Sequence, residues 1–502
     1  MIVLDGRNLN IEKLVRISRG WEKVKVAPES LEQIQNARSR IEEIVEIGAP
    51  VYGINTGFGK LADTPIENGE VSQLQKNLLM SHACGVGNPY SEDIVRGMMA
   101  LRINALIKGY SGIRMETIMK LMELLNKRVT PVVFEQGSLG ASGDLAPLSH
   151  MSLPLIGLGE VYYKGKRMPA KEGLKRAGIL PLDGLRAKEG LCLINGTQAM
   201  TSVGAHVLYD ACNLHYQAIG AYAMTMEALR GIVDAFDERI HRLRGHKGQI
   251  AYAISASKML ENSQLVTRQN ELRVQDAYSL RCAPQVGGAI ADTIGFVRKV
   301  VETEMNAVTD NPLVFEDGSA ISAGNFHGEP LAFAFDYLGI ALSELANISE
   351  RRIERMVNAN LSNGLPPFLV AKPGLNSGFM IVQYSAASLV SENKVLSHPA
   401  SVDSIPSSAN QEDHVSMGSI SARKAKTILE NTRRVIAMEY FASAQAIDFR
   451  DARKMAPKTK PMYDVIRQSV PFIEKDDTMY VHIQRIENLL ISGELSPKEV
   501  LK

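Results

Sequence analysis

Residues 330–355 read PLAFAFDYLGIALSELANISERRIER and carry the clearest structural signal in the chain. Apolar side chains recur there at steps of three or four, which places them on one face of a helix: Leu331, Phe335, Leu338, Leu342 and Leu345. Pro330 stands at the start, where proline is tolerated because the first helical N–H has no partner. The stretch predicts a long helix, and the charged run Glu350–Arg355 predicts a solvated face or a contact between subunits.

The same spacing recurs elsewhere. A segment that begins near Pro284 carries an apolar face, and Asp310-Asn311-Pro312 predicts its end, because the residue before proline is pushed out of the helical region. The side chains on this face are Ile290, Ile294, Val297, Val301 and Met305. Further helices are expected at 198–230, 376–396 and 420–446. Several long helices with apolar stripes predict a mainly α fold built as a helix bundle.

The N-terminal region is mixed in character. Short apolar segments alternate with glycine-rich turns, and residues 159–167 predict a hairpin around a Lys-Gly turn. We find no repeat, low-complexity segment or flexible linker, so we expect a single compact chain over 1–502. Within it, residues 1–190 form a smaller mixed α/β region and residues 191–502 form the helical bundle region.

Composition excludes several classes of function. The 502 residues hold 56 basic and 55 acidic side chains, a balance that argues against a nucleic-acid partner. The uncharged runs 190–209 and 373–391 contain polar side chains, which favours buried helices over membrane spans. There is no H-E-x-x-H motif to suggest a catalytic metal. Four scattered cysteines and an N-terminus without a long apolar core predict a cytoplasmic protein.

The stretch that carries chemistry is GSLGASGDLAPL, residues 137–148. It lacks the G-x-x-x-x-G-K-[ST] and G-x-G-x-x-G patterns of phosphate-binding loops, and Ser142 does not sit in G-x-S-x-G. A bare Ala-Ser-Gly tripeptide is usually a tight turn. A further reading makes the backbone itself the reagent: the Gly143 nitrogen attacks the Ala141 carbonyl and closes a five-membered ring. Loss of water from the ring and of the Ser142 hydroxyl then leaves an electrophilic exocyclic methylene.

The run GSLGASGDLAPLSH resembles the signature of the aromatic amino-acid ammonia-lyases, whose prosthetic group is 4-methylidene-imidazole-5-one (MIO). Further segments resemble the histidine ammonia-lyases of that family, in the family's order between residues 51 and 418: VYGINTGFGK, NLLMSHACGVG, LINGTQAM, VQDAYSLRC, GNFHGEP and NQEDHVSMG. The resemblance implies MIO formed from Ala141-Ser142-Gly143. It also implies a long-helix bundle of the fumarase and aspartase superfamily, and a homotetramer whose chains share active sites.

The resemblance also implies residue roles. Tyr52 is expected to be the base that takes the substrate β-proton, provided that its surroundings lower its pKa. Arg281 is expected to pair with the substrate carboxylate through its planar fork. Tyr278 is expected on the same helical face as Arg281, as a second active-site tyrosine. The remaining expected contacts with substrate or prosthetic group are Gln275, Asn195 and the aromatic wall Phe326.

Two positions bear on the substrate. His82 matches the family's selectivity position, and Glu412 stands where relatives that act on phenylalanine or tyrosine generally have no glutamate. A carboxylate can bind an imidazole, whereas a phenyl ring would leave it unpaired. The expected reaction is therefore L-histidine to trans-urocanate and ammonia, the first step of histidine degradation. The alternatives are a tyrosine or phenylalanine ammonia-lyase, an MIO-dependent aminomutase, or a non-catalytic helical scaffold.

Overall fold

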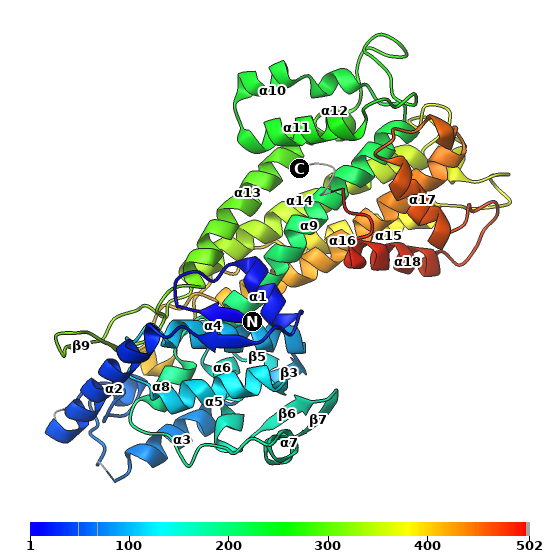
Figure 1. Cartoon of the computed structure of the whole chain (residues 1–502). Helices are drawn as coiled ribbons and strands as arrows, with labels where there is room; N and C mark the ends of the chain where they lie inside the picture. Colours follow the sequence, from blue (N-terminus) through cyan, green and yellow to red (C-terminus); the bar gives the residue numbers. More distant parts are fainter. Residues whose placement is uncertain (49, 68, 498–502) are drawn as a thin grey trace. The chain divides into compact units, whose positions relative to one another are not determined.

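The computed structural model describes residues 1–48, 50–67 and 69–497, and it is mostly helical (Figure 1). The chain divides into two compact units. The first unit comprises residues 1–209, 298–336 and 399–423, and the second comprises 210–297, 337–398 and 424–502. The first unit thus draws on both of the regions expected from the sequence, 1–190 and 191–502. That these regions form a single compact chain stays a prediction.

The first unit combines short helices with short strands. Its helices are α1 (Ile11–Ser18), α2 (Ser30–Ile47), α3 (Val71–His82), α4 (Glu92–Leu106), α5 (Met115–Asn126), α6 (Leu145–Ser152), α7 (Ala170–Ala177) and α8 (Glu189–Ile194). Its strands are β1 (Ile2–Leu4), β2 (Val24–Val26), β3 (Val86–Pro89), β4 (Val129–Pro131), β5 (Phe134–Gln136), β6 (Glu160–Tyr163), β7 (Lys166–Pro169), β8 (Leu313–Val314) and β9 (Ala320–Ile321).

One strand pair in this unit follows from local turn chemistry. Strands β6 and β7 pair antiparallel around Lys164 and Gly165, whose φ angles of 50° and 73° suit a tight two-residue turn. The predicted hairpin at 159–167 is therefore confirmed. Strand β4 pairs with β6 to give a three-stranded sheet, and the other sheets are the pairs β1–β2, β3–β5 and β8–β9.

The long helices confirm the predicted bundle elements. They are α9 (Gln198–Ala228), α13 (Ala283–Glu304), α14 (Glu329–Val357), α15 (Met380–Leu396) and α16 (Gly418–Asp448). The remaining helices of the second unit are α10 (Glu238–Arg244), α11 (Lys247–Met259), α12 (Tyr278–Arg281), α17 (Lys460–Ser469) and α18 (Met479–Ser492). In α14 the predicted stripe is buried, from Leu331 at 0% exposure to Leu345 at 2%. By length and composition α14 could cross a membrane, but 67% of its most apolar window is buried within the protein.

One expectation about these helices is wrong in detail, and another holds only in part. Helix α13 ends at Glu304, before the predicted stop, because the Asn306 side-chain amide donates to the Glu302 carbonyl at 2.8 Å and competes for it with the helical backbone. The charged run of α14 is not simply a solvated face. Arg352 is 1% exposed and donates to both carboxylate oxygens of buried Glu439, at 2.6 and 2.8 Å.

Candidate active site

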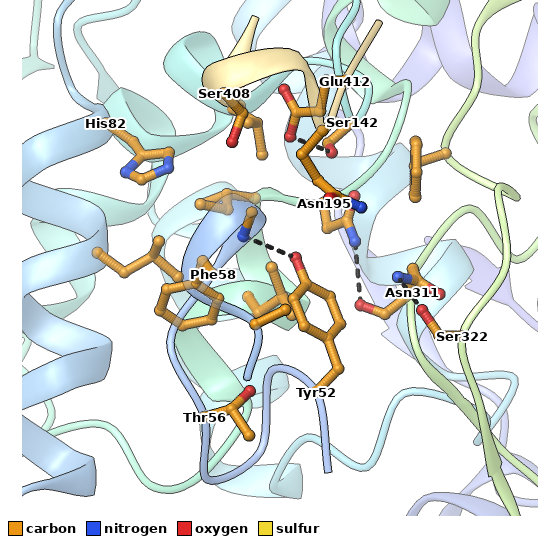
Figure 2. Close-up of a pocket in the computed structure, with 18 of the residues that line it drawn as sticks. Tyr52, Thr56, Phe58, His82, Ser142, Asn195, Asn311, Ser322, Ser408 and Glu412 are labelled. Carbon is orange, nitrogen blue, oxygen red and sulfur yellow. Dashed lines mark hydrogen bonds between the residues drawn. The ribbon is translucent and has the colours of Figure 1, made fainter. Parts of the chain in front are cut away.

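The first unit contains a cavity of about 720 Å³, and six of the residues expected from the sequence line it. They are Tyr52, His82, Ser142, Asn195, Phe326 and Glu412. In Figure 2 the labelled side chains of this set surround one space, although they come from segments far apart in the sequence. Over the described residues, no group of three or more His, Cys, Asp or Glu side chains is arranged to hold a metal ion.

The tripeptide Ala141-Ser142-Gly143 forms a tight turn at this cavity. Gly140 and Gly143 pair as an isolated antiparallel bridge, so Ala141 and Ser142 occupy the two central positions. Ser142 adopts a left-handed φ of 52°, which is uncommon for a residue with a side chain. The turn brings the peptide groups of Ala141 and Gly143 into one local bend, which is the arrangement that ring closure between them requires.

Gly143 tests whether this turn suits the expected prosthetic group. Its φ is +74°, and a Cβ placed on it would lie 2.3 Å from the carbonyl oxygen of Gly196. That oxygen is held at 2.8 Å by the backbone N–H of Asp144, so it cannot easily move away. Only glycine fits at the position whose nitrogen must act as nucleophile. The residues present therefore fit an MIO group.

Asp144, which was not predicted from the sequence as a site residue, holds the turn on the side away from the cavity through hydrogen bonds. It is fully buried, and its carboxylate accepts hydrogen bonds from the Met200 N–H at 2.8 Å, the Ser138 hydroxyl at 3.1 Å and the Ser419 hydroxyl. Burial raises the pKa of this carboxyl to about 6, although these hydrogen bonds act to lower it. The signal available in the sequence was its position directly after the tripeptide.

Glu412 reaches the turn from a distant loop. The Ser142 hydroxyl donates to Glu412 Oε1 at 3.3 Å across 270 residues of sequence (Figure 2). The two segments are held together near this contact, because the Met417 N–H donates to the Leu139 carbonyl at 3.0 Å. Ala141 also packs with Val415 and Met417 in a small apolar cluster. The structure thus brings the expected selectivity carboxylate directly to the expected electrophile.

Tyr52 points its hydroxyl into the same space. That hydroxyl accepts a long hydrogen bond of 3.5 Å from the Gly59 N–H (Figure 2). Burial raises the pKa of Tyr52 above its ordinary value of 10, and the charges of Glu412 and Asp310 add to the rise. Buried Lys188 acts in the opposite direction but does not reverse it. The expectation that the surroundings lower this pKa is therefore not met within the chain itself.

His82 and Asn195 complete the polar lining. His82 ends α3, and burial lowers its pKa, so that the imidazole is neutral near pH 7. Asn195 follows α8, and its side-chain amide nitrogen donates to the Asn311 backbone carbonyl at 3.0 Å. The side-chain oxygen Oδ1 of Asn195 is buried without a partner among the described residues. Asn311 also donates to Ser322 at 3.1 Å. Asn311 was expected only as part of a helix stop, and no separate pattern in the chain indicated its place at the cavity.

Comparison with known proteins identifies the family. Residues 9–468 match the family model described as aromatic amino acid lyase. The chain belongs to the aromatic amino acid lyase family. Within it, histidine ammonia-lyase 1 of Fusobacterium nucleatum is 55% identical over 496 residues, which cover 98% of this chain and 96% of that protein.

Solved structures of the family agree with the fold. The crystal structure of histidine ammonia-lyase from Trypanosoma cruzi has a TM-score of 0.91 and 43% identity, and the match covers 98% of this chain and 94% of that one. The tyrosine aminomutase from Streptomyces globisporus has a TM-score of 0.95 and 39% identity, and the match covers 98% and 97%. The predicted long-helix fold of the fumarase and aspartase superfamily is confirmed.

Three expected residues lie in the second unit of this lyase-family chain and are not among the described residues that line the cavity: Gln275, Tyr278 and Arg281. Tyr278 and Arg281 share the short helix α12, and the Arg281 guanidinium lies 4.4 Å from the centre of the Tyr278 ring. Their predicted common face is confirmed. Tyr278 is 70% exposed and Val274 65% exposed, so this segment presents apolar surface to solvent.

Proposed function

We propose that this protein is a histidine ammonia-lyase, which converts L-histidine to trans-urocanate and ammonia as the first step of histidine degradation. The observation that carries the proposal is the contact between Ser142 and Glu412 at a cavity that also holds neutral His82. A carboxylate and an imidazole at one cavity suit a substrate ring that both donates and accepts hydrogen bonds. A phenyl ring would leave the Glu412 carboxylate desolvated and unpaired.

We propose that Ala141, Ser142 and Gly143 form the MIO group. The group would supply an electrophile that captures the substrate amine and makes it a better leaving group. Residues of the chain itself would bind and orient the substrate. Glu412 and His82 would bind the imidazole, Asn195 would offer its unpartnered carbonyl oxygen to a donor in the cavity, and Phe326 would form an apolar wall.

We propose Tyr52 as the base that takes the β-proton. Its raised pKa means that the phenol keeps its proton at neutral pH unless positive charge comes to the cavity. Arg281 is the cation expected to bind the substrate carboxylate. Bringing Arg281 close would oppose the effect of Glu412 and Asp310 on Tyr52 and favour the phenolate.

We propose a homotetramer in which a neighbouring copy supplies Gln275, Tyr278 and Arg281. The exposed aromatic ring of Tyr278 and the exposed Val274 support this, because apolar surface of this kind marks contacts with other chains. Arg281 and Tyr278, which already contact each other on α12, would then enter the cavity of the neighbouring copy together. We further propose a cytoplasmic location, in line with four cysteines that are all free.

A tyrosine or phenylalanine ammonia-lyase, or an aminomutase, is the second candidate, and the likeness to a tyrosine aminomutase structure favours the aminomutase. The test is to incubate the protein separately with histidine, tyrosine and phenylalanine while following ultraviolet absorbance and ammonia, and to separate the amino-acid products by chromatography. Urocanate and ammonia from histidine support the proposal. Coumarate or cinnamate without urocanate contradicts the substrate, and a β-amino acid as main product indicates the mutase.

A further inference from the structure

The segment that carries Glu412 is a short closed loop with Ser407 at its base. The Ser407 N–H donates to the Glu412 carbonyl at 2.9 Å, and the Glu412 N–H donates to the Ser407 carbonyl at 3.2 Å. Between them Ser408, Ala409 and Asn410 have φ angles of 50°, 52° and 67°. This left-handed backbone is unfavourable for Ser408 and Ala409, because the side chain crowds the following carbonyl oxygen, whereas asparagine tolerates it. The loop thus adopts an unfavourable backbone conformation that reverses the chain direction and places Glu412 opposite Ser407.

The two carboxylate oxygens of Glu412 have different partners. Oε1 accepts from the Ser142 hydroxyl at 3.3 Å, on the side of the cavity. Oε2 accepts from the Ser407 hydroxyl at 3.1 Å. Ser407 is half-buried and is not among the described residues that line the cavity. Its side chain therefore contacts the carboxylate from behind and leaves the opposite oxygen directed toward the tripeptide.

Ring closure at the tripeptide removes the Ser142 hydroxyl and with it the donor to Oε1. We infer that Ser407 is the positioning residue that keeps the Glu412 carboxylate oriented once that hydroxyl is gone, so that Oε1 is free for the substrate. This inference rests on the proposed function. It assigns Ser407 no contact with substrate, and it makes the effect of Ser407 depend entirely on Glu412.

The test is a double-mutant cycle on turnover of histidine, with Ser407→Ala, Glu412→Ala and the pair. A hydrogen bond to a charged group predicts that Ser407→Ala lowers kcat/KM by about 10- to 100-fold. In the Glu412→Ala background the same change should alter kcat/KM by less than about twofold, because no carboxylate remains to be positioned. If Glu412→Ala leaves no measurable turnover, the cycle is run on the dissociation constant of urocanate by calorimetry.

Two further variants separate positioning from folding. Ser407→Thr keeps a hydroxyl and suits the extended backbone at φ −135° and ψ 176°, so it should restore activity to within about threefold of wild type. Ser404→Ala is the matched control, because its hydroxyl accepts from the Val415 N–H at 3.1 Å in the same segment rather than contacting Glu412. Any effect of Ser404→Ala should be equal in both backgrounds. The intact mass of each variant reports whether two water molecules have been lost.

The outcomes distinguish this inference from the proposed function. An equal loss from Ser407→Ala with and without Glu412, or unchanged activity in Ser407→Ala, overturns the positioning role while wild-type turnover of histidine stands. If wild type instead acts on another aromatic amino acid, the proposed substrate is wrong. The same cycle on that amino acid then still decides the role of Ser407.

Discussion

Replacing Gly143 with alanine tests the turn from which the electrophile is expected to form. The new Cβ would lie 2.3 Å from the Gly196 oxygen and 2.5 Å from its carbonyl carbon. The left-handed φ of +74° costs a residue with a side chain about 1 to 2 kcal/mol, and overpacking against backbone adds about 1 to 3 kcal/mol. Gly196 is itself confined, because a Cβ there would lie 2.5 Å from Arg102 Nη1. We expect the free energy of unfolding to fall by about 2 to 5 kcal/mol.

The control is Gly318→Ala. Gly318 has a similar φ of +83°, but its Cβ would meet nothing within 4 Å. The free energy of unfolding of Gly318→Ala should fall only by the backbone term of about 1 to 2 kcal/mol, and turnover should stay normal. The assays are urea unfolding, intact mass and urocanate production. Gly143→Ala should be less stable than Gly318→Ala, keep its full translated mass and turn over little histidine. Equal stability of the two variants, with water lost normally from Gly143→Ala, would show that the close approach of Gly196 does not restrict this position to glycine.

Four further outcomes are expected. Ser142→Ala should fold with wild-type stability but lose most activity, and retained turnover would remove the reason for invoking the electrophile. Burial raises the pKa of Asp144 to about 6, so its stabilising contribution is full below pH 3.8 and is lost as pH rises through about 6. In urea unfolding, the difference in free energy of unfolding between wild type and Asp144→Asn should therefore fall by about 1 kcal/mol from pH 5 to pH 7. An unchanged difference would contradict the raised pKa of the Asp144 carboxyl. Arg281→Lys should raise KM for histidine about 10-fold through loss of bidentate pairing, and an unchanged KM would exclude Arg281 as the carboxylate ligand. Glu439→Gln leaves Arg352 buried beside a neutral partner and should cost about 3 to 5 kcal/mol in urea unfolding, whereas a loss below 1 kcal/mol would show that the pair is dispensable.

Local periodicity predicted what depends on near neighbours in the chain. The stripe of α14 and the hairpin around Lys164 and Gly165 follow from spacing and turn chemistry alone. The shared face of Tyr278 and Arg281 follows from a separation of three residues on a helix. These features need no knowledge of the tertiary structure, which is why they were predictable.

Features that depend on distant packing were not predictable in this way. A charged run gives no sign that Arg352 turns inward to meet Glu439 on another helix. Ser408 and Ala409 have no intrinsic preference for the left-handed backbone they adopt, so the loop that brings Glu412 to Ser142 left no local signal. Resemblance to a family supplied Glu412 as a site residue, but its contact with the tripeptide and its hydrogen bond with Ser407 required the structure.

The most direct test is the mass of the peptide that contains residues 141–143, released by proteolysis from purified protein that turns over histidine. We expect a mass lower than that of the translated sequence by two water molecules, one from ring closure and one from the Ser142 hydroxyl. A linear peptide of full mass, in a preparation that still produces urocanate and ammonia, would contradict it.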